Sequence, residues 1–218
     1  TCALPISLQL GELYLEKRVG QRQVDAEPVA LCNGSDALLL PVARDYKRAK
    51  TGDEGENTGG MGAYCPGDNL SDAQKDFVRT RIIEPVLKKF RYRGLLYVGL
   101  MIASERADDI AIVEFNCRFG DPETQSILPL IEGDLLEYLM WTDDGVAQEF
   151  PLVKNGSSTI VPYRRGAVVN VVISAKGYPG EFAKDIPLVF PDFKNTDLHV
   201  TGAGLKESVG RLLSTGGR

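Results

Sequence analysis

The sequence predicts an α+β fold in which antiparallel β-hairpins pack against amphipathic helices. Two pairs of short apolar runs are each joined by a polar turn, a pattern that is typical of hairpins. Two longer segments repeat apolar residues at helical spacing. The chain is 43% hydrophobic over 218 residues, which is enough to build a core.

The predicted strands form two hairpins. Residues 28–42 hold two apolar runs around Asn33-Gly34, and residues 94–103 and 110–115 form a second pair around a polar turn. Between the hairpins, residues 44–66 are rich in glycine and charge and follow neither hydrophobic period. We therefore expect a long loop there, and loops of this length usually have a function.

Two segments are predicted to be helical. Residues 71–90 begin with Ser71 as a candidate N-cap and contain Pro85, which predicts a kink or a boundary. Residues 126–141 return to helical spacing, with Gly133 as the expected break. A strand rich in Val and Ile follows at residues 167–174 and opens a segment with several glycine and proline breaks, which indicates a small β-rich unit.

The domain organisation expected from these patterns has three parts. Residues 1–21 are unassigned and show no clear element pattern, which would fit a non-native segment. Residues 22–154 form the main domain, and residues 155–218 form the small β-rich domain after a linker around residues 155–158. Both ends read as cuts, because the chain starts without Met and stops at a glycine turn, so the small domain is expected to be truncated.

Composition excludes several classes of function. Lys and Arg number 25 against 30 Asp and Glu, for a net charge of -5, so we expect no nucleic-acid partner. The apolar runs are shorter than the roughly 18 residues of a membrane span, so we expect no membrane partner. The four cysteines form no CxxC pair, which argues against a zinc site and a disulfide framework. A soluble protein of the reducing cytoplasm is therefore expected.

The first chemical motif is an alternation of polar residues after the second hairpin. If the strand persists to Arg118, Glu114, Asn116 and Arg118 lie on one face, while Phe115 and Cys117 lie on the core face. A carboxylate and an amide oxygen suit Mg²⁺, and an adjacent guanidinium suits a transferring phosphoryl group. The same alternation, taken alone, also describes a polar pair on a half-exposed strand.

The second motif is the cationic and glycine-rich segment before the first predicted helix. Glycines allow backbone N–H groups to converge on an anion, and nearby Lys and Arg add positive charge. The segment is not a Walker A loop, since no Gly-Lys-Ser/Thr closes it, and a flexible turn beside solvated charges is the alternative. The candidate substrate-binding residues are Asp45, Lys47, Arg48, Asn57, Thr58, Gly59, Gly60 and Gly62.

Taken together, these motifs resemble the glycinamide ribonucleotide synthetase (phosphoribosylamine-glycine ligase) family of the ATP-grasp superfamily in content, order and spacing. The segments that carry the resemblance are Asp45–Arg48, Asn57–Pro66, Leu96–Ile102, Glu114–Gln125 and Ser174–Gly180. The sequence departs from the usual family pattern at Tyr46, where His is common, and at Glu56, where Pro is common. Neither departure touches the proposed metal ligands.

The resemblance implies a fold, a reaction and roles for several residues. The fold would be the carboxyl-terminal part of an ATP-grasp domain, with an antiparallel sheet and helices, followed by the small β-rich domain. The reaction would join glycine to 5-phosphoribosylamine through glycyl phosphate, using ATP as substrate and Mg²⁺ or Mn²⁺ as cofactor. Glu114 and Asn116 match the metal ligands, and Arg118 and Asp121 match the catalytic run that follows.

Two alternative functions remain open for the sequence. A different ATP-grasp ligase would share the metal motif but not the loop at residues 57–64, and a regulatory module derived from a ligase is the non-enzyme alternative. The parent protein could be fused to other purine-pathway enzymes. The chain by itself is expected to be an inactive fragment, since the part of an ATP-grasp that closes over the nucleotide is absent.

Overall fold

The computed structural model describes residues 24–67, 70–143, 152–155, 158–190, 199 and 204–218. The unassigned segment 1–21 and part of the predicted linker, residues 156–157, lie outside them. The described residues divide into two compact units. Unit 1 comprises those up to Tyr46 and those of Gly62–Asn170, and unit 2 comprises those of Lys47–Met61 and Val171–Arg218. No helix within these ranges combines the length and apolarity that a membrane crossing requires.

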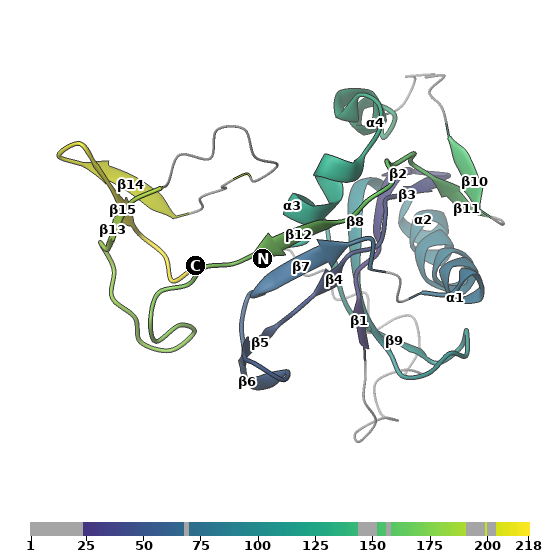
Figure 1. The fold of residues 1–218 in the computed structure, drawn as a ribbon. Coiled ribbons are helices and arrows are strands. Elements are labelled where there is room, and N and C mark those ends of the chain that lie inside the picture. Colours follow the sequence, from purple (N-terminus) through teal and green to yellow (C-terminus); the bar gives the residue numbers. More distant parts are fainter. Residues whose placement is uncertain (1–23, 68–69, 144–151, 156–157, 191–198, 200–203) are drawn as a thin grey trace. The chain divides into compact units, whose positions relative to one another are not determined.

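Unit 1 is built on a seven-stranded mixed sheet with the order β1-β8-β2-β3-β11-β10, in which β9 also pairs with β8 (Figure 1). Its strands are β1 (Val24–Ala26), β2 (Val29–Asn33), β3 (Ala37–Leu39), β8 (Arg93–Ile102), β9 (Ile110–Asn116), β10 (Val153–Asn155) and β11 (Ser158–Ile160). We expected an antiparallel sheet, but β3 and β11 run parallel. The chain reaches β11 only after the strands β4 to β10 and the helical segments between them, and a long crossover connection is what parallel pairing requires.

Both predicted hairpins are confirmed. In the first, β2 and β3 pair antiparallel across a turn in which the Asn33 side chain accepts from the Ser35 and Asp36 N–H groups at 3.1 and 2.8 Å. Gly34 has φ +92°, a conformation that glycine adopts at little cost. In the second, β8 and β9 pair with a bulge between Gly99 and Leu100. Local turn chemistry therefore accounts for the first hairpin, and a bulge adjusts the register of the second.

The long loop predicted for residues 44–66 is wrong, because this segment holds four short strands. They are β4 (Arg44–Asp45), β5 (Arg48–Lys50), β6 (Glu54–Asn57) and β7 (Gly62–Cys65). In unit 1, β4 and β7 join β12 (Val168–Val171) in a sheet of order β12-β7-β4, and in unit 2, β5 pairs with β6. The strands β5 and β6 are largely exposed, so they bury no periodic apolar residues that a pattern search could detect.

The first predicted helix is present as one continuous coil with three segments (Figure 1). These are α1 (Asp72–Phe77), the π-helical η2 (Val78–Ile83) and α2 (Glu84–Phe90). Ser71 is the N-cap, as predicted, and forms a capping box with Gln74. The π-helical segment ends just before Pro85, which lies in the first turn of α2, where a missing backbone N–H costs little.

The second predicted helix is interrupted, as expected. Its segments are α3 (Thr124–Ile127), the 3-10 helix η3 (Leu128–Leu130) and α4 (Leu135–Met140). Gly133 has φ +93° and lies in the break. Asp134 then begins α4, because its side chain accepts from the Leu136 N–H at 2.8 Å. A helix therefore ends and restarts where the sequence places Gly-Asp.

Two apolar cores lie on opposite faces of the large sheet. Along β8, Leu96, Val98 and Leu100 belong to the core that contains residues of α1, η2 and α2, whereas Tyr97 belongs to the core that contains residues of α3, η3 and α4. This division follows from the period of two in a strand. The Tyr97 face is the one on which the polar residues of the candidate site gather.

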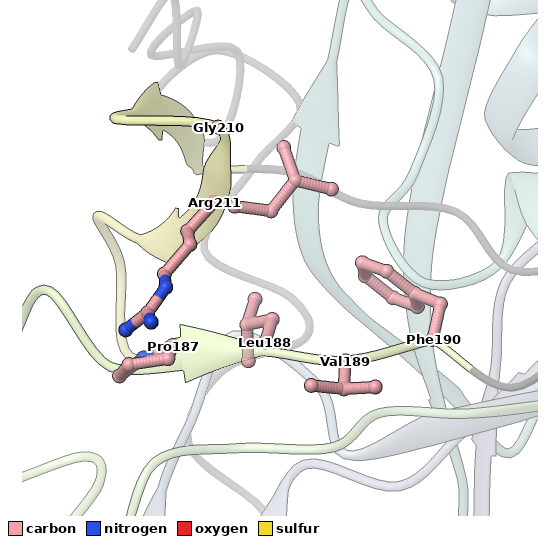
Figure 2. Close-up of a pocket in the computed structure, with 7 residues that line it drawn as sticks. Pro187, Leu188, Val189, Phe190, Gly210 and Arg211 are labelled. Carbon is pink, nitrogen blue, oxygen red and sulfur yellow. The ribbon is translucent and has the colours of Figure 1, made fainter.

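Unit 2 contains a small antiparallel sheet of order β13-β15-β14, formed by β13 (Pro187–Leu188), β14 (Leu205–Ser208) and β15 (Arg211–Ser214). A hollow of about 550 Å³ lies between β13 with the two residues that follow it and the start of β15 (Figure 2). It is lined by Pro187, Leu188, Val189, Phe190, Gly210, Arg211 and Leu212. None of the candidate site residues lines this hollow.

Candidate functional site

The candidate metal ligands lie at the end of β9. Glu114 lies opposite Gly99 and Asn116 lies opposite Tyr97, so the two ligands are two residues apart on the same face of the hairpin. A Cβ placed on Gly99 would stand 3.2 Å from Glu114 Cγ, which is tighter than most real contacts. Glycine at position 99 therefore leaves room for the Glu114 side chain to lie across the neighbouring strand.

Asn116 is 9% exposed, and its Nδ2 has no hydrogen-bond partner among the described residues. An unsatisfied buried amide group is costly and calls for an explanation. The Nδ2 and Oδ1 atoms of an Asn side chain are told apart by the hydrogen bonds around them. The unsatisfied position can therefore hold either Nδ2, which donates, or Oδ1, which accepts. Glu114 and Asn116 therefore fit a hard cation such as Mg²⁺, which takes few protein oxygens and completes its shell with water and phosphate.

The predicted alternation does not reach Arg118, because β9 ends at Asn116. Phe115 is buried on the opposite face, as expected, but Cys117 is exposed rather than part of the core. Arg118 is also exposed, and its Nη1 donates to the Phe119 carbonyl at 2.9 Å. The guanidinium has five N–H groups, so donors remain for a phosphoryl oxygen.

Asp121 lies just before α3 and is exposed. Its Oδ1 accepts from Gln125 Nε2 at 2.9 Å, one turn further along the chain. This contact ties Asp121 to the first turn of the helix that follows the motif.

A buried acidic cluster near this motif was missed by the sequence analysis. Carboxylate oxygens of Glu27, Asp45 and Glu123 all lie within 4.8 Å of one another, and the three residues are 0%, 3% and 2% exposed. Three such oxygens form a donor set that a divalent cation could bind. Asp45 was predicted to bind substrate, but the three residues come from distant segments, so no local pattern linked it to Glu27 and Glu123.

Burial raises the pKa of the Glu123 carboxyl to about 9, with a hydrogen bond to Glu27 and the charge of Glu27 as further causes. The Tyr97 hydroxyl donates to Glu123 Oε1 at 3.1 Å, and burial together with the two glutamates raises the pKa of Tyr97 as well. Glu123 therefore carries a proton at neutral pH. This proton lowers the charge of the cluster, which would otherwise bury three carboxylates.

Tyr97 joins both ends of the segment from Asn116 to Glu123. It lies opposite Asn116 in the hairpin, and its hydroxyl binds Glu123. Gly120, between these ends, allows the close approach, since a Cβ there would stand 2.3 Å from Glu123 Oε2 and 2.9 Å from Tyr97 Cε2. The loop that carries Arg118 and Asp121 is thus anchored at both ends on the Tyr97 face of the sheet.

Most of the predicted substrate-binding residues lie together in unit 2, around the β5–β6 hairpin. Arg48 lies opposite Asn57, and Arg48 Nη1 donates to the Gly55 carbonyl at 2.9 Å. The Lys47 carbonyl accepts from the Thr58 N–H at 2.7 Å and from its Oγ1 at 2.9 Å. Lys47, Arg48, Asn57 and Thr58 are therefore neighbours, as the motif suggested.

The converging N–H groups expected in this segment are only partly available. The Gly59 N–H donates to the Tyr178 hydroxyl at 3.1 Å, and the Gly60 N–H donates to Thr58 Oγ1 at 3.0 Å. These two amides are therefore satisfied within the protein and do not form the predicted anion nest. Asp45 and Gly62 lie in unit 1, on the paired strands β4 and β7.

The family model and the relatives described next point to one family. Residues 15–124 match the phosphoribosylglycinamide synthetase, ATP-grasp (A) domain family. The chain is similar to the phosphoribosylamine-glycine ligase of Leptospira interrogans, with 42% identity over 96% of this chain and 50% of the relative. It is also similar to the trifunctional purine biosynthetic protein adenosine-3 of Homo sapiens, with 37% identity over 93% of this chain and 20% of that protein.

Among solved structures, the crystal structure of the phosphoribosylamine-glycine ligase of Thermotoga maritima is similar, with a TM-score of 0.72 and 33% identity. The likeness covers 93% of this chain and 47% of that one. The chain thus spans about half the length of the ligases that it matches. The family match extends over half of the chain, through the two hairpins and the metal motif, and the chain therefore belongs to the phosphoribosylglycinamide synthetase ATP-grasp (A) domain family.

Proposed function

We propose that the chain acts within a longer phosphoribosylamine-glycine ligase. In this reaction, a glycine carboxylate oxygen attacks the γ-phosphorus of ATP and gives glycyl phosphate and ADP. The amine of 5-phosphoribosylamine then attacks the carbonyl carbon, loses a proton and displaces inorganic phosphate. The product is glycinamide ribonucleotide. The similarity to named ligases over almost the whole chain supports this assignment.

The observation that carries the proposal is the placement of Glu114 and Asn116 on one face at the end of β9, opposite Gly99 and Tyr97. These two side chains would hold Mg²⁺ or Mn²⁺ through one carboxylate and one amide oxygen. When bound, the metal would neutralise the charge of the phosphates. Arg118, with donors remaining beyond its bond to Phe119, would contact the transferring phosphoryl group.

Lys47 and Arg48, at the start of the β5–β6 hairpin of unit 2, would bind the phosphorylated substrate. Lys47 and Arg48 supply positive charge, and Arg48 is fixed by its bond to Gly55. A phosphate monoester such as that of 5-phosphoribosylamine is bound most strongly by charged donors. Since two glycine amides are satisfied internally, side chains rather than a backbone nest would provide most of this affinity.

Three broader assignments accompany the proposal. The sheet β13-β15-β14 would belong to a small β-rich domain. The protein would act in the cytoplasm. The parent would carry further purine-pathway activities, as the name of the human relative, a trifunctional protein, suggests for that protein.

The experiment that tests the proposal compares Glu114→Ala with Glu105→Ala in a full-length ligase that contains this chain. Glu105 is an exposed glutamate in the turn at the other end of the same hairpin, so it controls for loss of charge. Loss of a metal ligand should lower the ligation rate about a hundredfold or more, and Glu105→Ala should leave it unchanged. Near-normal turnover of Glu114→Ala at saturating Mg²⁺ would contradict the metal assignment.

A further inference from the structure

Two side chains from distant parts of unit 2 hold the Thr58–Gly60 loop. The Tyr178 hydroxyl accepts from the Gly59 N–H at 3.1 Å, and Arg218 Nη1 donates to the Gly60 carbonyl at 3.1 Å. Tyr178 lies more than a hundred residues after the loop, and Arg218 is the last residue of the sequence. These contacts bind backbone groups of two adjacent residues, so together they fix both the position and the orientation of the loop.

The guanidinium of Arg218 lies across Gly59. A Cβ placed on Gly59 would stand 2.8 Å from Arg218 Nη2 and 2.9 Å from both Cζ and Nε. Three atoms of the planar group at nearly the same distance indicate that its face, rather than its edge, covers the glycine. Gly59 is not among the glycines with positive φ, so it is required for this close approach and not for its backbone angle.

The two holding residues are themselves packed together. Gly217 is buried, and a Cβ there would stand 2.4 Å from Tyr178 Cδ2 and 2.8 Å from the Phe182 ring. The rings of Tyr178 and Phe182 lie 6.0 Å apart, and the Ala175 N–H donates to the Gly217 carbonyl at 2.7 Å. Because Gly217 precedes Arg218, this packing fixes the start of the Arg218 side chain.

The loop in turn holds the backbone of Lys47, the residue before β5. Thr58 donates twice to the Lys47 carbonyl, from N–H at 2.7 Å and from Oγ1 at 2.9 Å. Thr58 Oγ1 also accepts from the Gly60 N–H at 3.0 Å. A continuous set of hydrogen bonds therefore runs from Tyr178 and Arg218 through Gly59 and Gly60 to the backbone of Lys47.

We propose that Tyr178 and Arg218 are positioning residues for the phosphorylated amine substrate. They hold the Thr58–Gly60 loop and, through it, place Lys47 for contact with the phosphate group. This inference rests on the proposed function, in which Lys47 and the loop bind 5-phosphoribosylamine. Neither residue touches the reacting atoms in this proposal, so the effect is expected on substrate affinity more than on the chemical step.

The test measures the Michaelis constants of all three substrates for Tyr178→Phe, Arg218→Ala and Arg218→Lys in a full-length ligase that contains this chain. Tyr178→Phe keeps the ring that packs on Gly217 and removes only the acceptor of the Gly59 N–H. Loss of a neutral hydrogen bond should raise the Michaelis constant for 5-phosphoribosylamine about two- to tenfold. Loss of the charged donor in Arg218→Ala should raise it roughly tenfold or more. The constants for ATP and glycine should change less than about twofold.

Matched controls and rescue separate positioning from general damage. Tyr163→Phe and Arg211→Ala alter exposed residues of the same types and should leave all three constants unchanged. Guanidinium ion at millimolar concentration should lower the constant of Arg218→Ala toward the wild-type value, and Arg218→Lys should fall between the two. A purely structural role would give equal changes for all three substrates and no rescue, which would overturn the inference.

Lys47→Ala distinguishes failure of this inference from failure of the proposed function. If Lys47→Ala raises the constant for 5-phosphoribosylamine while Tyr178→Phe and Arg218→Ala do not, the positioning role is refuted and the substrate assignment stands. If none of the three changes this constant, both are refuted. Should Arg218→Ala fail to fold, as judged by thermal unfolding, Tyr178→Phe decides the question alone.

Discussion

Replacing Glu123 with Gln should remove a pH dependence of stability that the buried acidic cluster creates. Burial, with Glu27 as a second cause, raises the pKa of Glu123 from 4.5 to about 9 in the folded protein. Between these two values the folded protein binds more protons than the unfolded chain does. The contribution of this proton is therefore fully present below the unfolded pKa, and it is lost as the pH rises through the folded pKa.

The size of the effect follows from linkage. One additional bound proton lowers the free energy of unfolding by at most about 1.4 kcal/mol for each unit of rising pH, so the wild type should lose at most about 2.7 kcal/mol between pH 6 and 8. Gln at position 123 keeps an oxygen that can accept from Tyr97 and an amide that can donate to Glu27, as the protonated carboxyl does. The variant should therefore match the wild type only below about pH 4.5, and its advantage in stability over the wild type should grow by at most about 2.7 kcal/mol between pH 6 and 8.

Urea unfolding at pH 6, 7 and 8, followed by the fluorescence of Trp141, the single tryptophan, measures this difference. Glu105→Gln is the matched control, since Glu105 is exposed, and it should follow the wild type at every pH. If Glu123→Gln and the wild type lose stability in parallel between pH 6 and 8, Glu123 does not hold a proton in the folded state and the description of the cluster is wrong.

Two further predictions test separate parts of the structure. Lys47→Ala in a full-length ligase should raise the Michaelis constant for 5-phosphoribosylamine by about tenfold or more, because a charge-assisted contact is lost, and equal effects on glycine would instead indicate a role in folding. Ser71→Ala should lower the free energy of unfolding by about 1 kcal/mol in urea titrations, because it removes the hydroxyl that accepts from the Gln74 N–H, and an unchanged midpoint would mean that the capping box contributes nothing.

The parts of the fold that the sequence predicted are those encoded by local patterns. The Asn33-Gly34 turn, the Ser71 N-cap and the break at Gly133 each depend on residues within a few positions of one another. The short strands β5 and β6 were not predicted, because their side chains are largely exposed and the sequence therefore shows no alternation of apolar and polar residues there. The parallel pairing of β3 with β11 depends on a crossover that no local pattern reveals.

For the candidate site, too, the sequence predicted the part that lies within one strand and missed the part that depends on tertiary packing. Glu114 and Asn116 share a face because strand alternation is local, but the strand ends at Asn116, so the prediction for Cys117 was wrong. The cluster of Glu27, Asp45 and Glu123 depends on three distant segments meeting on one side of the sheet. Only tertiary packing brings such groups together, and a buried acidic residue has no local sequence signature.

The central claim is that this segment serves a ligase that activates glycine as an acyl phosphate, and the fate of one oxygen atom tests it directly. In that mechanism the glycine carboxylate oxygen that attacks ATP leaves with the phosphate when the amine displaces it. A full-length ligase that contains this chain, supplied with glycine labelled with ¹⁸O in its carboxylate, should therefore transfer one labelled oxygen to inorganic phosphate in each turnover, as measured by mass spectrometry. Formation of product with unlabelled phosphate would contradict the acyl phosphate, and ATP cleavage independent of glycine would contradict the ligase assignment itself.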